Sequence, residues 1–176
     1  MIRSFCALTL NEENAELIAK LNNSIQGMRF TKPEQLHITL KFYGELINEQ
    51  FVDIKESLYE VRMKPFTLQI DEAGYFSNRS GFILYAGIKE STSLKKLQKQ
   101  IEDFAYRIGI PKEKRKFFAH ITLARGLPKN VSDYISEFQK LNFMEWNISS
   151  FILYKSTLRP EGPLHEIEEE YLLHES

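Results

Sequence analysis

Alternating apolar and polar residues predict that much of this chain forms strands. Between Phe66 and Asp71 every second residue is apolar, which is typical of a strand that buries one face. Comparable runs occur throughout the sequence. They predict strands at Ile2–Leu10, Leu36–Tyr43, Phe66–Ala73, Phe82–Ile88, Ala119–Ala124, Ile148–Lys155 and Leu164–Leu172.

Other segments carry apolar residues at the three- and four-residue spacing of an amphipathic helix. The first follows a candidate cap at Asn11, the second follows Asn48, the longest is expected to stop near Gly109, and the last begins near Ser132. Their apolar positions are, in order, Leu17, Leu21, Ile25 and Met28; Phe51, Ile54, Leu58 and Val61; Leu94, Leu97, Ile101, Phe104 and Ile108; and Ile135, Phe138 and Leu141. Helices and strands alternate without a Gly/Ser/Pro linker, which predicts one compact α+β body.

The tetrapeptide His-Ile-Thr-Leu occurs once in each half of the chain, at His37–Leu40 and at His120–Leu123. An internal repeat indicates repeated architecture. Because side chains alternate along a strand, the histidine and the threonine of each copy share one face, and the isoleucine and leucine face the core. If a pseudo-two-fold axis relates the halves, the two His/Thr faces line one groove.

Two facing histidines can act as an acid/base pair without a metal. Histidine has an unperturbed pKa near 6.5, so one ring can be neutral while the other is protonated. Hydrolysis of a phosphodiester needs a base that activates water and an acid that protonates the leaving oxygen, each typically worth about 10²–10⁴-fold in rate. The hydroxyls of Thr39 and Thr122 can donate hydrogen bonds to the phosphoryl oxygens.

Strict alternation places Lys41 and Tyr43 on the face of His37, and Phe118 next to His120. The aromatic rings are candidates for stacking on a nucleobase. Each feature also has a simpler interpretation: a single strand histidine is more often structural, and Tyr43 and Phe118 are more often packing residues. The duplication favours chemistry for the histidines, because structure does not require the same residue twice.

A metal site and a cysteine nucleophile are the competing kinds of chemistry. The sequence holds no His-x-His, His-x₃-His or His-Glu-x-x-His, and neither His165 nor His174 has a ligand spacing to the pair. Cys6 lies in an apolar strand without an adjacent base. We therefore expect no metal and no other cofactor.

Composition excludes several classes of protein. The chain has 176 residues, of which 43% are hydrophobic and 27% are charged, values that are ordinary for a globular domain. A net charge of −1 argues against wrapping long nucleic acid but permits recognition of one terminal phosphate. The basic run Lys112–Lys116 is most simply a solvated loop, or else a funnel that guides an anionic substrate to His120.

The expected location follows from what the chain lacks. No apolar run reaches the roughly 20 residues of a membrane span, and the N-terminus does not have the pattern of a signal peptide. The single cysteine, Cys6, cannot form an internal disulfide. These features predict a cytoplasmic protein without a membrane anchor.

The two motifs in their contexts resemble the two-histidine phosphoesterase superfamily, specifically the LigT-like RNA 2′,3′-cyclic phosphodiesterases, also called the 2′-5′ RNA ligase family. The resemblance covers nearly the whole chain. It rests on Phe5, Ala7 and Leu10; on Pro33–Glu45; on Gly74, Phe76, Ala86 and Gly87; on Phe117 with His120–Arg125; and on Phe151, Leu153, Tyr154 and Ser156 with Gly162.

The resemblance implies an α+β, bilobal, pseudo-two-fold fold in which two antiparallel sheets form a central cleft with helices outside. Residues 1–176 would form one two-lobed domain with one His-x-Thr-x motif in each lobe. The implied activity is metal-independent hydrolysis of RNA 2′,3′-cyclic phosphodiester ends to 2′-phosphomonoesters, by a monomer, with 2′,5′-RNA ligation as the reverse reaction. His37 would be the proton donor and His120 the proton acceptor, while Thr39, Thr122 and Arg125 would bind the phosphate.

Further candidates for contact with the substrate are Lys41, Tyr43, Phe117, Phe118, Tyr154 and His165. The chain departs from the family pattern at Ala119, where proline is common, at Tyr43, where leucine is usual, and near His165, where tyrosine is frequent. Strict alternation also places Arg125 on the face opposite His120. It can reach the phosphate only if the strand ends or bulges at Ala124-Arg125-Gly126.

Two rival functions stay open at this point. A phosphodiesterase on the same scaffold could act on small cyclic nucleotides or 2′,5′-oligoadenylates. Alternatively, the protein could be a non-catalytic module that binds RNA ends.

Overall fold

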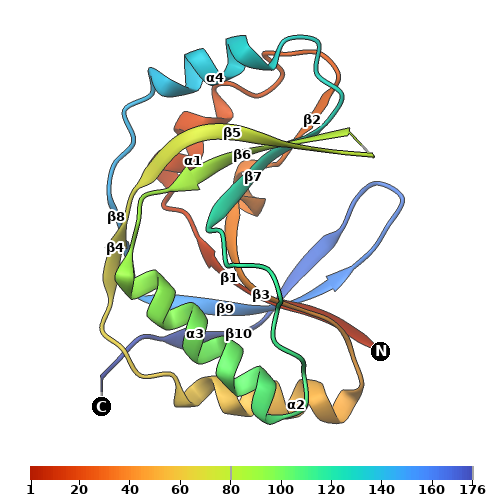
Figure 1. Cartoon of the computed structure of the whole chain (residues 1–176), viewed down its shortest axis with the longest axis vertical. Coiled ribbons are helices and arrows are strands. Elements are labelled where there is room, and N and C mark those ends of the chain that lie inside the picture. Colours follow the sequence, from red (N-terminus) through yellow and green to blue (C-terminus); the bar gives the residue numbers. More distant parts are fainter. Residues whose placement is uncertain (80, 176) are drawn as a thin grey trace.

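The computed structural model describes residues 1–79 and 81–175. An eight-stranded sheet has the order β10-β9-β1-β3-β7-β6-β5, with β2 paired to β7, and a second sheet contains only β4 and β8 (Figure 1). The strands are β1 Ile2–Thr9, β2 Met28–Phe30, β3 His37–Leu46, β4 Phe66–Leu68, β5 Ile70–Asn78, β6 Gly81–Ile88, β7 His120–Gly126, β8 Trp146–Ile148, β9 Ser150–Thr157 and β10 Leu164–Leu172. The α-helices are α1 Glu12–Ala19, α2 Asn48–Ser57, α3 Thr92–Arg107 and α4 Val131–Gln139.

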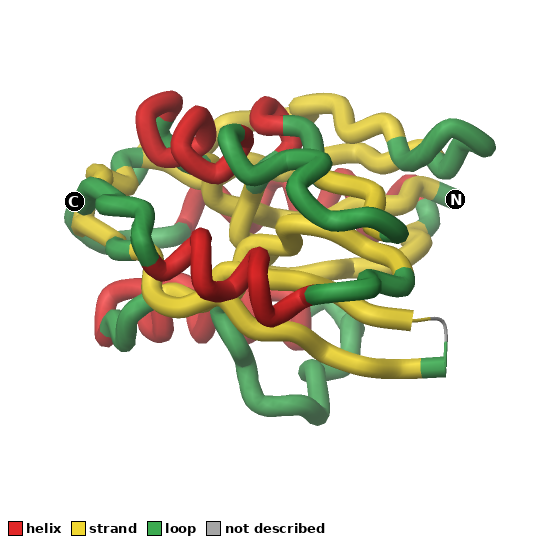
Figure 2. The backbone as a smooth tube through the Cα atoms, turned by 90° about the horizontal axis from the view of Figure 1, so that it is seen from above, coloured by secondary structure: helices red, strands yellow, loops and turns green. Residues whose placement is uncertain are grey.

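The predicted α+β class, with antiparallel sheets and helices outside them, is confirmed. The eight-stranded sheet has two halves: the first half-sheet is β10-β9-β1-β3, and the second is β7-β6-β5 with β2. Within the described chain the halves are joined through the single residue pair Ile38 and Ile121. The halves diverge from this junction in Figure 1, and Figure 2 shows helices on the outside of the strands. The pair lies in the middle of both tetrapeptides, so the repeat marks the junction.

The core faces of the two repeats are those that alternation predicts. Ile38, Leu40, Ile121 and Leu123 are all buried, while each histidine and threonine is half-buried. Full burial of an aliphatic side chain of this size stabilises the fold by about 1.5–3 kcal/mol. These side chains therefore hold the two strands in place and leave the opposite face for polar residues.

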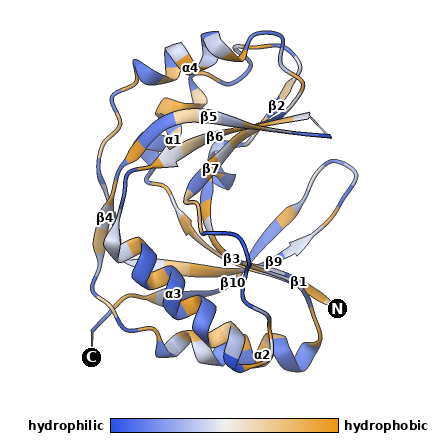
Figure 3. Ribbon diagram, in the orientation of Figure 1, coloured by the Kyte–Doolittle hydropathy of each residue, from blue (hydrophilic) through white to orange (hydrophobic). Residues whose placement is uncertain are grey.

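Helix α3 also follows its predicted pattern. It buries Leu94, Leu97, Ile101 and Phe104, and Figure 3 shows polar and apolar residues alternating along it. The Ser91 hydroxyl accepts a hydrogen bond from the Leu94 backbone N–H, which caps the first turn. The helix follows β6 of the second half-sheet in sequence, yet it packs on β3 of the first. It thereby ties the two halves together.

The first helix is shorter than predicted. It begins after Asn11 as expected but ends at Ala19, so Leu21, Ile25 and Met28 lie outside it. Asn23 has a left-handed φ of 65° and Gly27 a φ of 87°, conformations that do not continue a right-handed helix. The chain turns through these residues and reaches Met28–Phe30, which form β2, a strand that the sequence pattern did not predict.

Other boundaries also differ from the predicted ones. Helix α2 starts at Asn48 itself, with Ile47 as its cap, and ends at Ser57, so Leu58 begins a separate 3₁₀ turn. The run predicted as one strand from Phe66 breaks after Leu68, and the run predicted from Ile148 breaks after that residue. Both short segments leave the large sheet and pair with each other as β4 and β8. Alternation continues through the first break, from Leu68 to Ile70, so it gave no indication of it, whereas at the second break Ser149 and Ser150 interrupt the apolar pattern.

No helix in the described part of the chain is both long and apolar enough to cross a membrane.

Candidate active site

Both histidine strands carry a β-bulge at the same position of their repeat. On β3, Thr39 pairs with Ala7 and Lys41 pairs with Cys6, so Leu40 is the extra residue. On β7, Thr122 pairs with Tyr85 and Ala124 pairs with Leu84, so Leu123 is the extra residue. A bulge inserts one residue into one strand and re-aims the side chains that follow it. The alternation of side chains therefore shifts by one residue after each tetrapeptide. Positions that strict alternation assigns to the histidine face now lie on the core face, and positions assigned to the core face lie on the histidine face.

On β7 this exchange turns Arg125 toward the same side as Thr122. Ala124 is buried, Arg125 is exposed, and Arg125 lines a cavity together with His120 and Thr122. The sequence predicted that Arg125 could reach the face of His120 only through a strand end or a bulge at Ala124-Arg125-Gly126. The strand does bulge, but the extra residue is Leu123. Gly126 is not part of the bulge. A Cβ at this position would lie 2.1 Å from the Gly27 carbonyl oxygen, so only glycine fits here. It allows β2 and β7 to approach each other closely.

On β3 the same exchange overturns the predicted placement of Lys41 and Tyr43. Both side chains are buried, and neither shares the face of His37. Phe42 instead is 49% exposed and lines the cavity, at the position that Arg125 occupies in the second repeat. Strict alternation was wrong beyond Leu40 because it ignored the bulge. Tyr43 is not among the described residues that line the cavity, whereas Lys41 lines it beside Glu102, so contact of Lys41 with substrate stays a prediction, and Phe42 joins the candidates.

Tyr43 and Lys41 have structural partners in the core. The Tyr43 hydroxyl lies 3.4 Å from the Cys6 sulfur. The Lys41 ammonium donates to Glu102 Oε1 at 2.8 Å and to the Pro111 carbonyl at 3.4 Å. The same Glu102 oxygen accepts a hydrogen bond from the Glu113 backbone N–H at 2.9 Å. The buried ion pair thus fixes the start of the loop that leads to His120.

That loop carries the basic run of the sequence. Arg115 and Lys116 line the cavity next to Phe117 and Phe118, whereas Lys112 is paired with Asp103. Part of the basic run therefore faces the cavity, which favours the funnel interpretation over a purely solvated loop for these two residues.

Each catalytic-candidate histidine is oriented by the backbone two residues before it. His37 Nδ1 lies 2.7 Å from the Gln35 carbonyl oxygen, and His120 Nδ1 lies 2.8 Å from the Phe118 carbonyl oxygen. A carbonyl oxygen can only accept a hydrogen bond, so Nδ1 is the protonated nitrogen in both rings. Nε2 of each ring does not take part in this hydrogen bond. It can accept a proton when the ring is neutral and donate one when the ring is charged.

His37 is surrounded by rings from the first half-sheet. Its ring centroid lies 5.3 Å from that of Phe5 and 5.8 Å from that of His165. Tyr154 stacks on Phe5 at 5.0 Å, and His165 Nδ1 lies 3.2 Å from the Ser156 hydroxyl. The structure therefore brings the sequence candidates Tyr154 and His165 to His37.

His120 has a matching set of rings from the second half-sheet. Phe118 stacks on it with centroids 5.5 Å apart, and Phe76 and Tyr85 approach edge-on at 5.8 Å and 5.9 Å. Tyr85 can lie there because Gly74 has no side chain; a Cβ would lie 2.6 Å from the Tyr85 hydroxyl. The sequence pattern does not mark Tyr85 as a site residue. Only strand pairing, which sequence pattern does not reveal, places it beside Thr122.

A cavity of about 710 Å³ opens between the half-sheets. Its walls combine hydroxyl, cationic, carboxylate and aromatic groups, and its lining includes Thr39, Thr122, His120, Arg125, Phe42, Phe76, Phe117 and Phe118, with Lys41, Glu102 and Glu113 beside them. His37 is not among the described residues that line it directly. It is nonetheless close enough to His120 and Arg125 for the positive charge of each to lower its pKa. The cavity therefore brings Thr39, Thr122, Arg125 and His120 together next to His37.

Burial is the largest cause of a lowered pKa at His37. The hydrogen bond to the Gln35 carbonyl opposes this effect, and the charges of His120 and Arg125 reinforce it. The pKa of His165 is also lowered, first by burial and then by the charge of His37. Without an anion in the cavity, His37 thus favours its neutral form. A bound phosphate would act in the opposite direction and favour the charged form.

We expect an NMR titration of His37 to have its midpoint below the ordinary histidine value of 6.5. Arg125→Met should move that midpoint upward, because removal of a nearby positive charge makes the imidazolium less unfavourable. Arg107→Met, at the far end of α3, is the matched control and should leave it unchanged. A midpoint at or above 6.5 in the unmodified protein would contradict this electrostatic description.

The described residues contain no group of three His, Cys, Asp or Glu side chains that could hold a metal ion. Cys6 is fully buried, and burial raises its pKa to about 12, so its thiol stays protonated at neutral pH. The two histidines therefore stay the candidates for acid/base chemistry at the cavity.

Comparison with known proteins agrees with this geometry. A family model described as LigT like phosphoesterase matches residues 8–85 and 87–165, so that each matched segment holds one tetrapeptide. An RNA 2′,3′-cyclic phosphodiesterase from Archaeoglobus fulgidus is 32% identical over 94% of this chain and 97% of its own length. One of the same name from Methanocaldococcus jannaschii is 29% identical over 97% of this chain and 100% of its own length. The crystal structure of E. coli LigT in its apo form is 25% identical and superposes with a TM-score of 0.81 over 99% of this chain and 98% of that one.

Proposed function

We propose, on the premise that the chain belongs to the LigT-like phosphoesterase family, that it hydrolyses RNA 2′,3′-cyclic phosphodiester ends to 2′-phosphomonoesters. One structural observation supports this most. Two His-x-Thr strands with the same bulge present their hydroxyls and Arg125 to one cavity, with both histidines held by the same backbone contact. Relatives that match nearly the full chain carry the name of this activity.

In the proposed mechanism His120 is the base and His37 is the acid. Neutral His120 takes a proton from water on Nε2 as the water oxygen bonds to phosphorus. The bond from phosphorus to the 3′ oxygen breaks, and protonated His37 transfers its Nε2 proton to that oxygen. Both Nδ1 atoms keep their protons throughout and go on donating them as hydrogen bonds to the backbone carbonyl oxygens. The product carries its phosphate on the 2′ oxygen, and exchange of protons with solvent resets the pair.

The neighbouring groups support these roles. Negative charge on the non-bridging phosphoryl oxygens increases as water attacks, and Thr39, Thr122 and Arg125 can donate hydrogen bonds to them. The anionic substrate also adds negative charge beside His37, whose pKa is lowered by burial and by the nearby positive charge of Arg125. Binding of the phosphate therefore favours the protonated His37 that the acid role needs. If the 5′ hydroxyl of a second RNA takes the place of water as nucleophile, the same base and acid would support 2′,5′-RNA ligation, with the 3′ oxygen again as the leaving group.

We further propose that residues 1–176 act as a single two-lobed domain, as a cytoplasmic monomer. Phe118, Phe42 and Phe76 are exposed rings at the cavity and are suited to stacking on a base. Tyr154 and His165 are proposed contacts on the side of His37, and Phe117 on the side of His120. His165 takes this role in place of the tyrosine that is frequent near that position in the family.

A panel of substrates tests the proposal. We expect turnover of an oligoribonucleotide ending in a 2′,3′-cyclic phosphate to exceed turnover of 3′,5′-cyclic nucleotides and of 2′,5′-oligoadenylates, and to persist in excess EDTA. Faster turnover of either small substrate would favour that rival function. Binding of the RNA end without turnover would favour the non-catalytic module, and loss in EDTA that zinc restores would contradict the metal-independent mechanism.

A further inference from the structure

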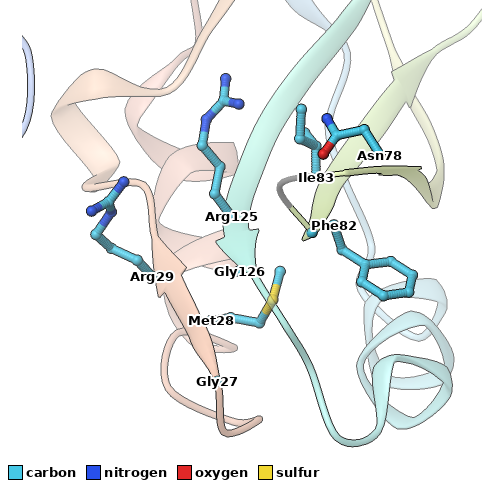
Figure 4. A pocket seen from close by; sticks show the side chains of 9 residues that line it. Gly27, Met28, Arg29, Asn78, Phe82, Ile83, Arg125 and Gly126 are labelled. Atoms are coloured by element: carbon cyan, nitrogen blue, oxygen red, sulfur yellow. The ribbon is translucent and has the colours of Figure 1, made fainter.

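Two arginines lie directly opposite each other on neighbouring strands next to the proposed catalytic cavity. Arg29 of β2 is the register partner of Arg125 of β7. Figure 4 shows both side chains, together with Ile83, projecting to one side of the strands, while Phe82 points to the other. Phe30, which follows Arg29, packs with Tyr134 on the core side, so the exposed Arg29 lies on the face of the cavity.

The arrangement is electrostatically unfavourable without a ligand. Like charges directly opposite each other across an antiparallel pair destabilise a sheet. Among the residues that the structure describes, neither arginine forms an ion pair with a carboxylate. An anion between or beside the two guanidinium groups would remove this repulsion and would accept several hydrogen bonds from their planar donors.

The position of β2 is fixed by specific contacts to β7. The Thr31 backbone N–H donates to the Leu123 carbonyl at 2.8 Å, and its hydroxyl donates to the Thr122 carbonyl at 2.9 Å. At the other end, Gly27 and Gly126 allow the strands to approach closely. Arg29 is therefore held on a defined strand that is anchored at the bulge, next to Thr122.

A second cavity of about 610 Å³ surrounds this pair. It shares Arg125, Asn78 and Ile83 with the cavity of the histidines, so the two cavities are neighbours along β7. Arg29 belongs only to the outer one. Neighbouring strands are about 4.8 Å apart, so the backbone of Arg29 lies one strand away from that of Arg125. A ligand that occupied both cavities would carry a second anionic group beyond the first.

We propose that Arg29, beside Arg125, forms a second phosphate subsite that binds the phosphate on the 5′ side of the terminal nucleotide. This inference rests on the proposed function, because it takes the cyclic phosphate to be the group at the histidines. It specifies the substrate class further. The preferred substrate carries at least one phosphate besides the cyclic one, as any RNA chain end does and a bare nucleoside cyclic phosphate does not.

Three substrates that differ only at this phosphate test the proposal. They are a nucleoside 2′,3′-cyclic phosphate, the same molecule with a 5′-phosphate, and a dinucleotide ending in the cyclic phosphate. In the unmodified protein kcat/KM should be higher for the second and third than for the first. In Arg29→Ala that preference should fall by about tenfold to a hundredfold, as expected for a lost hydrogen bond to a charged group. Arg107→Ala is the control and should keep the full preference.

A binding measurement separates failure of the subsite from failure of the proposed function. The affinity for a fluorescent oligoribonucleotide ending in a 2′-phosphate is measured against salt concentration. Loss of one phosphate contact in Arg29→Ala should reduce the slope of log K against log salt by about 0.7. If no substrate turns over but this slope still falls, the activity is wrong and the subsite stands. An unchanged slope together with an unchanged substrate preference overturns the subsite.

Discussion

Replacing His120 by alanine should lower kcat for an RNA 2′,3′-cyclic phosphate by about 10²–10⁴-fold, the usual contribution of a positioned general base. His37→Ala should cause a loss of the same order, because the 3′ oxygen would leave without a proton. Both histidines are half-buried on the polar face of their strands, so neither substitution opens a hole in the core. Circular dichroism and thermal unfolding should therefore show a folded protein in both variants.

The double variant and the pH profile show whether the two histidines act together in one transition state or each contribute to the rate independently. Acid and base act in one transition state, so the loss in the His37→Ala/His120→Ala variant should be far smaller than the product of the single losses. The bell-shaped dependence of kcat/KM on pH should lose one limb in each single variant. His174→Ala, at an exposed position near the C-terminus, is the control. Full activity in either single variant would remove the acid/base assignment.

Replacing Lys41 by methionine should destabilise the protein by about 3–5 kcal/mol, the usual cost of leaving one member of a buried ion pair without its partner. Lys41 is 6% exposed and Glu102 is 12% exposed, so water would compensate only in part for the lost ammonium at the carboxylate. The midpoint of urea unfolding should fall without a change of slope. The double variant Lys41→Met/Glu102→Leu should recover most of the loss, because it leaves no unpaired charge in the core.

The same pair should also affect substrate binding through the loop that it holds. Lys41 and Glu102 fix Pro111 and Glu113, after which Arg115 and Lys116 reach the cavity. We expect the double variant to have a raised KM and a nearly unchanged kcat. Lys140→Ala removes an exposed pair with Glu137 and should cost at most about 1 kcal/mol. If Lys41→Met cost no more than this control, the structural role of Lys41 would be wrong.

The histidine motifs were predictable because both repeats carry the same local signal. A histidine and a threonine share one face, and an isoleucine and a leucine share the other, so each tetrapeptide predicts its own orientation. The next residues were not predictable in this way, because a bulge depends on the neighbouring strand. Cys6 of β1 and Leu84 of β6 pair beyond the extra leucine of each repeat, and nothing within the tetrapeptide encodes that pairing.

Strand β2 shows a second limit of sequence pattern. Met28 fits the helical spacing that began at Leu17, yet the helix ends at Ala19 and the chain returns as a strand of three residues. Its partner is β7, far away in the sequence, and a strand so short carries too few residues to show alternation. Arg29 therefore had no visible relation to Arg125 before the structure placed them opposite each other.

The duplicated site is symmetric in its histidines and threonines and asymmetric immediately after each bulge. The first repeat presents Phe42 where the second presents Arg125. The guanidinium of Arg125 is one of the two charges that lower the pKa of His37. A bound phosphate would neutralise this charge, which allows His37 to become the acid once substrate is present. The two strands are therefore equivalent in their histidines and threonines but differ in the charged or aromatic side chain that follows each bulge.

The position of the phosphate in the product tests the central claim most directly. The unmodified protein is incubated with an oligoribonucleotide that ends in a 2′,3′-cyclic phosphate, and the product is analysed by ³¹P NMR against synthetic standards. His37 as proton donor to the 3′ oxygen predicts a phosphate on the 2′ oxygen and a free 3′ hydroxyl. A phosphate on the 3′ oxygen would contradict the assignment of the two histidines, and an unchanged cyclic phosphate would contradict the proposed activity itself.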